Sequence, residues 1–201
     1  MSSLKLFIVR HGESVGNKLK VTQGQTDYDL TEKGINQAKK IAERLKNERI
    51  DIVYSSDLKR AFKTMEEIIK FHPNIKKVQS DKNLRERCKG IFQGKPKELL
   101  DAELVKSNSP YYIFEPKEGE SLITLYNKLF TFSDKLKVES QDNNILVVAH
   151  GEPIACILMH LLNKPVENYR EFLTKNTSLS ILEIKENNIK LSCLDCTNHL
   201  E

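Results

Sequence analysis

The chain has 201 residues, of which 39% are hydrophobic and 30% charged, so it is long enough to form one domain with a substantial core. No apolar run approaches the ~20 residues that a membrane-spanning helix requires, so neither such a helix nor a membrane partner is expected. Lysine and arginine number 32 against 28 acidic residues. Because this small excess is spread along the chain, nucleic acid is not an expected partner.

Apolar runs and helical periodicities alternate through most of the chain. This pattern is typical of a single α/β domain with a mostly parallel central sheet and helices on both of its faces. Strands are predicted over residues 4–9, 51–55, 144–149, 178–184 and 189–194. The third of them is apolar on both faces, so we expect it at the centre of the sheet. The last two should form a hairpin through residues 186–188 and complete the sheet at one edge.

Amphipathic helices are predicted between these strands, with apolar stripes at the three- and four-residue spacing of ordinary core helices. One begins after the capping residue Thr31, a second follows Ser56 and ends before His72, a third follows Gly119, and a fourth ends before Pro165. The residues expected to face the core are Ile35, Ala38, Ile41, Ala42 and Leu45; Leu58, Ala61, Met65, Ile68 and Ile69; Leu122, Leu125, Leu129, Phe132 and Leu136; and Ile154, Ile157, Leu158 and Leu161.

The stretch from about residue 81 to residue 118 interrupts this alternation. It contains glycines, prolines and many lysines, with only a short helical pattern around residues 97–105. We predict that it forms a lid over the carboxyl ends of the strands. Its lysines could meet a second phosphate or a carboxylate of a substrate, or could be solvated, which is the commoner fate of lysine. The lysines in question are Lys89, Lys95, Lys97 and Lys117.

Arginine and histidine residues follow three of the predicted strands. The first strand leads into Arg10 and His11, the second is followed by Arg60, and the third leads into His150 and Gly151. Because ligands bind beyond the carboxyl ends of the strands in an open α/β sheet, we expect these groups to meet at one rim. Two guanidiniums, helix-end amides and an imidazolium match the oxygens and the double charge of a phosphoryl group. The rim is therefore predicted to bind phosphate.

One of the two histidines could also act as a nucleophile, provided that a carbonyl holds the proton on its other ring nitrogen. A leaving alkoxide then needs a proton, which a carboxylic acid on a partly desolvated segment can supply. Glu86, at the start of the predicted lid, is the candidate for this role. Glu13 and Glu152 lie beside the two histidines in the sequence and remain alternatives.

Motifs of a known family run through nearly the whole chain. They are Val9–Ser14 with Asn17; Leu30–Gly34 with Gln37 and Ala38; Ser55–Leu58 with Arg60, Ala61 and Thr64; Leu84–Glu86; Gly90 and Gly94; Pro116 with Gly119–Ser121; Ala149–Gly151; and Asn176–Ser178. In their order and approximate spacing they resemble the histidine phosphatase superfamily, in its phosphoglycerate-mutase-like branch.

The resemblance implies a role for each matching residue. His11 would become transiently phosphorylated, and Glu86 would donate the leaving-group proton. Further expected site residues are Arg10, Asn17, Arg60 and His150, which would hold the phosphoryl oxygens, Gly151, which would add a backbone contact, and Gln23 and Gly24, which would bind substrate. No metal and no other cofactor is implied, because guanidinium and imidazolium charge takes the place of a divalent ion.

The family contains phosphatases and cofactor-dependent phosphoglycerate mutases, and three departures favour a phosphatase. Such mutases carry paired arginines in the lid that grip the substrate carboxylate, whereas Ser109–Phe114 contains none. The chain is shorter than a typical mutase, and Lys89 stands where mutases often have an aromatic residue. The stretch Glu86–Lys95 looks most like the bisphosphatase and broad-specificity phosphatase branches.

We therefore predict a metal-independent phosphatase that hydrolyses a small phosphate monoester, such as a sugar phosphate, a bisphosphate or a similar metabolite, through a phosphohistidine. The alternatives are a cofactor-dependent phosphoglycerate mutase and a catalytically silent phosphate-binding regulatory module. Activity on a generic aryl phosphate would separate an enzyme from a silent module.

Two further features bear on location and metal binding. Residues 1–9 resemble a strand and are too short for a signal peptide, so a cytoplasmic protein is expected. The four cysteines are too few and too unevenly placed for a disulfide framework. Cys193 and Cys196, together with His199, imitate metal-ligand spacing, but a zinc site needs a fourth ligand, so no metal site is predicted. The sequence does not indicate an oligomeric state.

Overall fold

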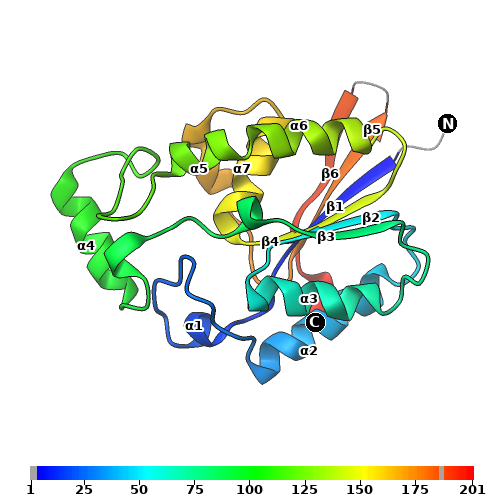
Figure 1. Ribbon diagram of the computed structural model, residues 1–201, viewed down its shortest axis with the longest axis horizontal. Helices are drawn as coiled ribbons and strands as arrows, with labels where there is room; N and C mark the ends of the chain where they lie inside the picture. The colour runs from blue at the N-terminus through cyan, green and yellow to red at the C-terminus, as the bar shows by residue number, and fades with distance from the viewer. Residues whose placement is uncertain (1–3, 186–187) are drawn as a thin grey trace.

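The computed structural model describes residues 4–185 and 188–201, within which six strands form one mixed, mostly parallel sheet (Figure 1). The strands are β1 (Leu4–Arg10), β2 (Ile52–Ser55), β3 (Lys77–Ser80), β4 (Ile145–Ala149), β5 (Leu179–Lys185) and β6 (Asn188–Cys196), in the spatial order β3-β2-β4-β1-β5-β6. Neighbours from β3 to β1 pair in parallel, and β5 runs antiparallel to both β1 and β6. The predicted α/β class is confirmed.

The sheet has the predicted centre and one predicted edge. β4 lies between β2 and β1, and all five of its residues are buried, as its apolar sequence indicated. The hairpin of β5 and β6 forms one edge; residues 186 and 187 of its expected turn lie outside the described residues. The opposite edge, β3, was not predicted. Its four residues are mostly exposed and polar, so they form no apolar run.

Helices cover both faces of the sheet (Figure 1). They are α1 (Val15–Lys18), α2 (Glu32–Leu45), α3 (Lys59–Ile69), α4 (Lys97–Ser107), α5 (Leu122–Lys128), α6 (Phe130–Glu139) and α7 (Gly151–Leu161), with 3-10 turns η1 (Lys82–Leu84), η2 (Gly90–Phe92), η3 (Val166–Phe172) and η4 (Asn198–Leu200). Strand β1 contributes side chains to two cores, one on each face of the sheet, because alternate side chains of a strand face opposite sides. Phe7 and Val9 pack with α2 and α3, whereas Leu6 and Ile8 pack with α5, α6 and α7.

Two details of the predicted helices were wrong. Ile35 is 37% exposed, because the inward stripe of α2 starts one residue earlier, at Gly34, which packs directly against the backbone of Glu13. The helix expected after Gly119 is two helices, α5 and α6, which meet at Leu129. Leu129 is nevertheless buried, so the apolar spacing continues through the break and gives no sign of it.

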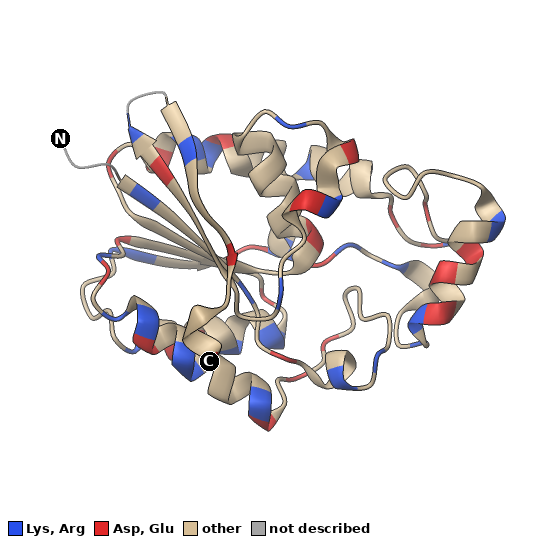
Figure 2. Ribbon diagram, turned by 180° about the vertical axis from the view of Figure 1, so that it is seen from behind, with Lys and Arg blue, Asp and Glu red and all other residues tan. Residues whose placement is uncertain are grey.

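The predicted lid lies at the end of the molecule where β1, β2 and β4 finish, and α4 extends beyond the sheet near α1 (Figure 1). Val21 and Pro96 form an isolated bridge that ties this segment to the loop after α1. Thr22 strengthens the tie, because its N–H donates to the carbonyl of Lys95 and its carbonyl accepts from Gly94, both at 2.8 Å. Acidic and basic residues are interspersed along the helices (Figure 2). None of the helices within the described ranges has the length and apolar character needed to cross a bilayer.

Candidate active site

Two histidines and two arginines come together where the central strands end. Because β1 and β4 pair in parallel and in register, His11 and His150 directly follow neighbouring strand ends. Their ring centroids lie 5.0 Å apart, with the ring planes inclined by 60°, and both side chains are buried. Arg10 is the last residue of β1, and Arg60 lies in the first turn of α3, which follows β2. The structure thus brings these four residues together in one site at the carboxyl ends of the central strands.

The His11 imidazole is held in one tautomer. Its Nδ1 lies 2.7 Å from the carbonyl oxygen of Gly12, which can only accept, so Nδ1 carries the proton and Nε2 keeps its lone pair. Burial and the positive charges of Arg60 and Arg10 hold the pKa of His11 well below its usual value, so the ring is neutral at pH 7. Gly12 is required here, because a Cβ would lie 2.5 Å from the carbonyl oxygen of Gly34.

Arg60 fixes the second histidine. Its Nε donates to Nδ1 of His150 at 3.2 Å, so Nε2 of His150 carries the proton and donates to the hydroxyl of Ser56 at 2.8 Å. The other guanidinium nitrogens of Arg60 donate to the carbonyls of Gly24 and Thr26, both at 2.8 Å. Burial lowers the pKa of Arg60 to about 10, so the fully buried guanidinium stays charged at pH 7. Burial and Arg60 also lower the pKa of His150.

Arg10 has donor capacity to spare. One terminal nitrogen donates to the carbonyl of Thr174, whereas the buried Nε has no partner among the described residues. A buried donor without a partner costs free energy, which a bound oxyanion would recover. Gly151 lies against this guanidinium, because a Cβ added there would be 3.7 Å from its central carbon.

A cavity of about 250 Å³ opens beside these groups. Its lining residues are Arg10, Asn17, Val21, Thr22, Gln23, Gly24, Glu86, Lys89, Lys97, Leu100, Asp101, Tyr111 and Glu152. The side-chain oxygen of Asn17 accepts hydrogen bonds from Ser14 and Asn176, so its amide nitrogen is the group left to donate to a ligand. His11, Arg60, His150 and Gly151 do not line the cavity themselves; they lie buried next to Arg10 and Gly24, which do.

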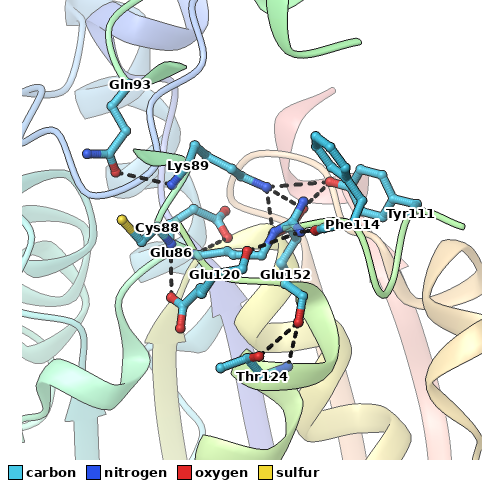
Figure 3. A network of polar contacts seen from close by, with 11 residues as sticks. Glu86, Cys88, Lys89, Gln93, Tyr111, Phe114, Glu120, Thr124 and Glu152 are labelled. Atoms are coloured by element: carbon cyan, nitrogen blue, oxygen red, sulfur yellow. Dashed lines mark hydrogen bonds and ion pairs between the residues drawn. The ribbon is translucent and has the colours of Figure 1, made fainter. Parts of the chain in front are cut away.

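Glu86 and Glu152, two of the three carboxyl groups that line the cavity (Figure 3), have opposite tendencies to ionise. Burial, reinforced by the negative charge of Glu152, raises the pKa of Glu86 above its usual value. Burial also disfavours the ionised form of Glu152, but Lys89 and Arg87 outweigh it and hold the pKa of Glu152 at about 2. When the pKa values of two neighbouring carboxyls are shifted in opposite directions, the carboxyl with the raised pKa is suited to donate a proton and the one with the lowered pKa is not.

Glu13, the third candidate, lies outside the cavity. One carboxylate oxygen accepts from the Thr31 hydroxyl at 2.9 Å, and the other accepts from Lys33 at 3.0 Å. The bond from Lys33 lowers the pKa of Glu13, so this carboxylate is ionised and engaged at the start of α2. Of the three carboxyls, only Glu86 is both in the cavity and biased toward its protonated form.

The four lid lysines lie in different environments. Lys89 is buried and paired with Glu152, and Lys97 lines the cavity from α4. Lys95 and Lys117 are exposed and do not line it, which agrees with the solvated alternative.

Several residues at the site were missed by sequence reasoning. Ser56 bonds to His150, and Asn176 donates from its amide to the His11 carbonyl at 2.9 Å. Tyr111 and Asp101 reach the cavity from the lid. Ser56 directly follows a strand, so its position gave a usable signal. The lid residues gave none, because their place depends on how an irregular segment folds back.

No group of three or more histidine, cysteine, aspartate or glutamate side chains in residues 4–185 and 188–201 is arranged to hold a metal ion. Cys193 and Cys196 lie near the end of β6, and both are free thiols, as are Cys88 and Cys156.

Comparison with known proteins identifies the family. The family model of the histidine phosphatase superfamily (branch 1) matches residues 6–197, and the chain belongs to this family. Phosphoserine phosphatase 1 of Hydrogenobacter thermophilus is 31% identical over 98% of this chain and 94% of its own length. A probable phosphoglycerate mutase of Yersinia pestis is 33% identical over 91% of this chain and 86% of its own.

Solved structures of other phosphatases have the same fold. The mycobacterial glucosyl-3-phosphoglycerate phosphatase superposes with a TM-score of 0.84 at 26% identity, over 97% of this chain and all of its own. The phosphoserine phosphatase of Entamoeba histolytica, in complex with 3-phosphoglyceric acid, superposes with a TM-score of 0.82 at 28% identity, over 98% of this chain and all of its own. With this family and these relatives, the chain is a phosphoric monoester hydrolase.

Proposed function

We propose that the protein is a metal-independent phosphatase that hydrolyses a small phosphate monoester through a phosphohistidine at His11. The observation that carries the proposal is the His11 tautomer. Nδ1 keeps its proton and donates it in a hydrogen bond to the Gly12 carbonyl, and the ring is neutral, so a nucleophilic Nε2 lone pair lies beside two guanidiniums that can neutralise an incoming phosphate.

The reaction proceeds in two steps. Nε2 of His11 attacks phosphorus, the ester P–O bond breaks, and Glu86 transfers its proton to the leaving oxygen. Water then attacks the phosphohistidine, the P–N bond breaks and returns its electron pair to Nε2, and the Glu86 carboxylate takes a proton from the water. Arg10 and Arg60 balance the charge of the transferred group, and the Asn17 amide donates to one of its oxygens. Proton transfer of this kind typically contributes ~10²–10⁴-fold to the rate.

The cavity favours a small leaving group. A cavity of about 250 Å³ has room for a small phosphorylated metabolite. Lys97 and Asp101, on α4, bring one positive and one negative charge to its rim. The names of two relatives refer to phosphoserine and to phosphoglyceric acid, which both carry a carboxylate. Phosphoserine and 3-phosphoglycerate are therefore the first substrates to test, ahead of sugar phosphates and bisphosphates.

A second candidate is a phosphoglycerate mutase, because one relative 33% identical to this chain bears that name. A mutase must return the phosphoryl group to the substrate and protect it from water. Against it, the stretch Ser109–Phe114 offers no arginine, and it contributes the uncharged Tyr111 to the cavity.

Phosphate release and covalent trapping together test the proposal. Purified protein, dialysed against EDTA, is incubated with phosphoserine, 3-phosphoglycerate, glucose 6-phosphate and p-nitrophenyl phosphate, and inorganic phosphate is measured. We expect turnover that EDTA does not reduce and acid-labile label on His11 in quenched samples. Turnover that is lost with EDTA and restored by Mg²⁺ or Zn²⁺, or turnover without labelled histidine, would contradict the proposal. Interconversion of phosphoglycerates without net phosphate release would identify a mutase, and no turnover at all a silent binding module.

A further inference from the structure

A cluster of four polar side chains lies at one wall of the cavity and has no direct part in the proposed phosphoryl transfer; Lys89, Tyr111 and Glu152 line the cavity, and Arg87 is buried behind them. Glu152, in the first turn of α7, is its only acidic member (Figure 3). Arg87 and Lys89 come from the chain just after the proposed proton donor, and Tyr111 comes from the stretch between α4 and α5. The cluster therefore joins three separate segments around one carboxylate.

Both oxygens of Glu152 are fully engaged. Lys89 Nζ lies 2.8 Å from each of them, and Arg87 Nε donates to Oε2 at 2.8 Å. The Tyr111 hydroxyl donates to Oε1, and the Arg87 guanidinium stacks on the Tyr111 ring with its central carbon 4.7 Å from the ring centroid. Arg87 is completely buried, and Lys89 and Glu152 are each 7% exposed.

A buried ion cluster of this kind is poorly explained as a source of stability. Removing charged groups from water costs about as much free energy as their attraction returns, so a well-packed apolar wall would serve as well. Its position suggests another use. Glu152 follows His150 by two residues, and the segment that carries Arg87 and Lys89 also carries Glu86.

The contacts lead directly to Glu86. One of its carboxyl oxygens accepts a hydrogen bond from the backbone N–H of Arg87 at 3.0 Å. The Arg87 side chain is in turn fixed by Glu152, and Lys89, three residues beyond Glu86, is neutralised by it. Glu152 thus sets both the place of the Glu86 segment and the charge beside it.

We propose that Glu152 is a positioning residue for the proton donor: it fixes Arg87 and neutralises Lys89, so that Glu86 faces the leaving group as the protonated acid. The inference rests on the proposed function and adds to it a residue outside the reacting atoms. Glu152 itself stays ionised throughout.

The charges around Glu86 determine what a substitution does. The groups that face it are Glu152 and Cys156 on α7, Arg10 on β1, Arg60 on α3, Tyr111, and Arg87 and Lys89 on its own segment. Together Arg87, Lys89 and Glu152 carry a net charge of +1. Glu152→Gln raises this charge to +2, which favours ionised Glu86, whereas Lys89→Met lowers it to zero, which favours protonated Glu86.

The test measures phosphorylation of the enzyme in single-turnover experiments across pH, with an alkyl phosphate and with p-nitrophenyl phosphate. Only the alkyl leaving group needs a proton. For Glu152→Gln we expect the alkaline loss of alkyl phosphate activity to move to lower pH, with a rate at least about tenfold below wild type at pH 8 and a much smaller change for p-nitrophenyl phosphate. For Lys89→Met, the pH at which activity on the alkyl phosphate is lost should move to a higher value.

Two further variants supply the rescue and the control. The double variant Lys89→Met/Glu152→Gln restores the net charge of +1, so its alkaline loss should return toward the wild-type position. Glu120→Gln is matched to Glu152→Gln, because Glu120 also bonds to the lid segment, accepting from the Cys88 N–H at 2.9 Å, but pairs with Lys128 outside the cavity. Glu120→Gln should leave the ratio between the rates with the alkyl phosphate and with p-nitrophenyl phosphate as in the wild type.

Equal losses on both substrates in Glu152→Gln would overturn the inference, as would shifts of the same sign in Glu152→Gln and Lys89→Met. If Glu152→Gln does not fold, as judged by thermal unfolding, the Lys89→Met shift decides alone: a shift to higher pH supports the inference, and any other result overturns it. Glu86→Gln separates this failure from that of the proposed function. If it too slows both substrates equally, the assignment of the proton donor is wrong, rather than that of its positioning residue.

Discussion

His11 meets two requirements that conflict for most histidines. A nucleophile must be neutral, and a phosphate site must be positive. The structure reconciles them through burial and two nearby guanidiniums, which lower the pKa of His11 while supplying the positive charge themselves. The hydrogen bond between Nδ1 and the Gly12 carbonyl then leaves Nε2 as the reactive atom.

The first prediction follows from this single role. His11→Ala should reduce hydrolysis of any substrate by at least about three orders of magnitude, because no other side chain can replace the nucleophile. His11 lies at a strand exit, so the variant should keep its secondary structure, which circular dichroism checks. Label that appears on His150 in the wild type, or activity that survives in the variant, would show that the nucleophile is assigned wrongly.

The second prediction concerns pH. The lowered pKa of His11 keeps the nucleophile neutral well below pH 6.5, and the raised pKa of Glu86 keeps the acid protonated above its usual range. Phosphorylation by an alkyl phosphate should therefore persist in mildly acidic solution and decline as pH rises through the Glu86 pKa.

The measurement is the single-turnover rate from pH 4.5 to 9. Above pH 7 both substrates are dianions, so a decline with the alkyl phosphate that p-nitrophenyl phosphate does not share reports the acid. Identical alkaline profiles for the two substrates would mean that Glu86 does not donate the proton.

At the scale of single residues, the sequence predicted those that directly follow strands. Arg10, His11 and His150 were found because the end of a parallel strand fixes where the next residue lies. Glu86 could not be separated from Glu13 and Glu152 in the same way, because the difference between them is one of environment. The partners that decide it, Lys89 for Glu152 and Lys33 for Glu13, depend on the folded lid and on α2.

At the scale of elements, predictability follows burial. β4 is buried on both faces and sits between two strands, so its apolar run was sufficient to identify and place it. β3 sits at an edge with three of its four residues exposed, so packing places no demand on its composition. Likewise the break between α5 and α6 carries neither glycine nor proline, and the buried Leu129 keeps the apolar pattern continuous.

The third prediction compares these two strands. Leu146→Ala, in β4, removes a completely buried side chain and should lower the free energy of unfolding by about 2–5 kcal/mol. Val78→Ala, in β3, changes a side chain that is 48% exposed and should cost less than about 0.5 kcal/mol. Urea denaturation measures both. Comparable losses would mean that β3 contributes to the core as β4 does.

At the scale of the whole molecule, charge is distributed in two ways. Acidic and basic residues are interspersed along the helices (Figure 2), whereas the site brings the guanidiniums of Arg10 and Arg60 together beside one cavity. The overall excess of 32 basic over 28 acidic residues therefore says little about the ligand. What the sequence did predict is the local excess at the strand ends, since topology brings those positions together whatever the remaining surface carries.

The last prediction tests whether that local charge binds an oxyanion. Burial lowers the pKa of both Arg10 and Arg60, which means that the site holds their positive charge at a cost. A bound phosphate compensates this charge, so it should stabilise the folded protein. At a concentration of 100 times its Kd, a ligand adds about 2.7 kcal/mol to the free energy of unfolding, which for a chain of this size raises Tm by roughly 5–10 °C.

Inorganic phosphate also stabilises proteins without binding to a site, so the Arg10→Leu variant is the control. The wild type should show the full shift in differential scanning calorimetry, saturating with concentration, and the variant only the small non-saturating part. Equal shifts in the two proteins would show that the guanidinium of Arg10 does not hold the anion.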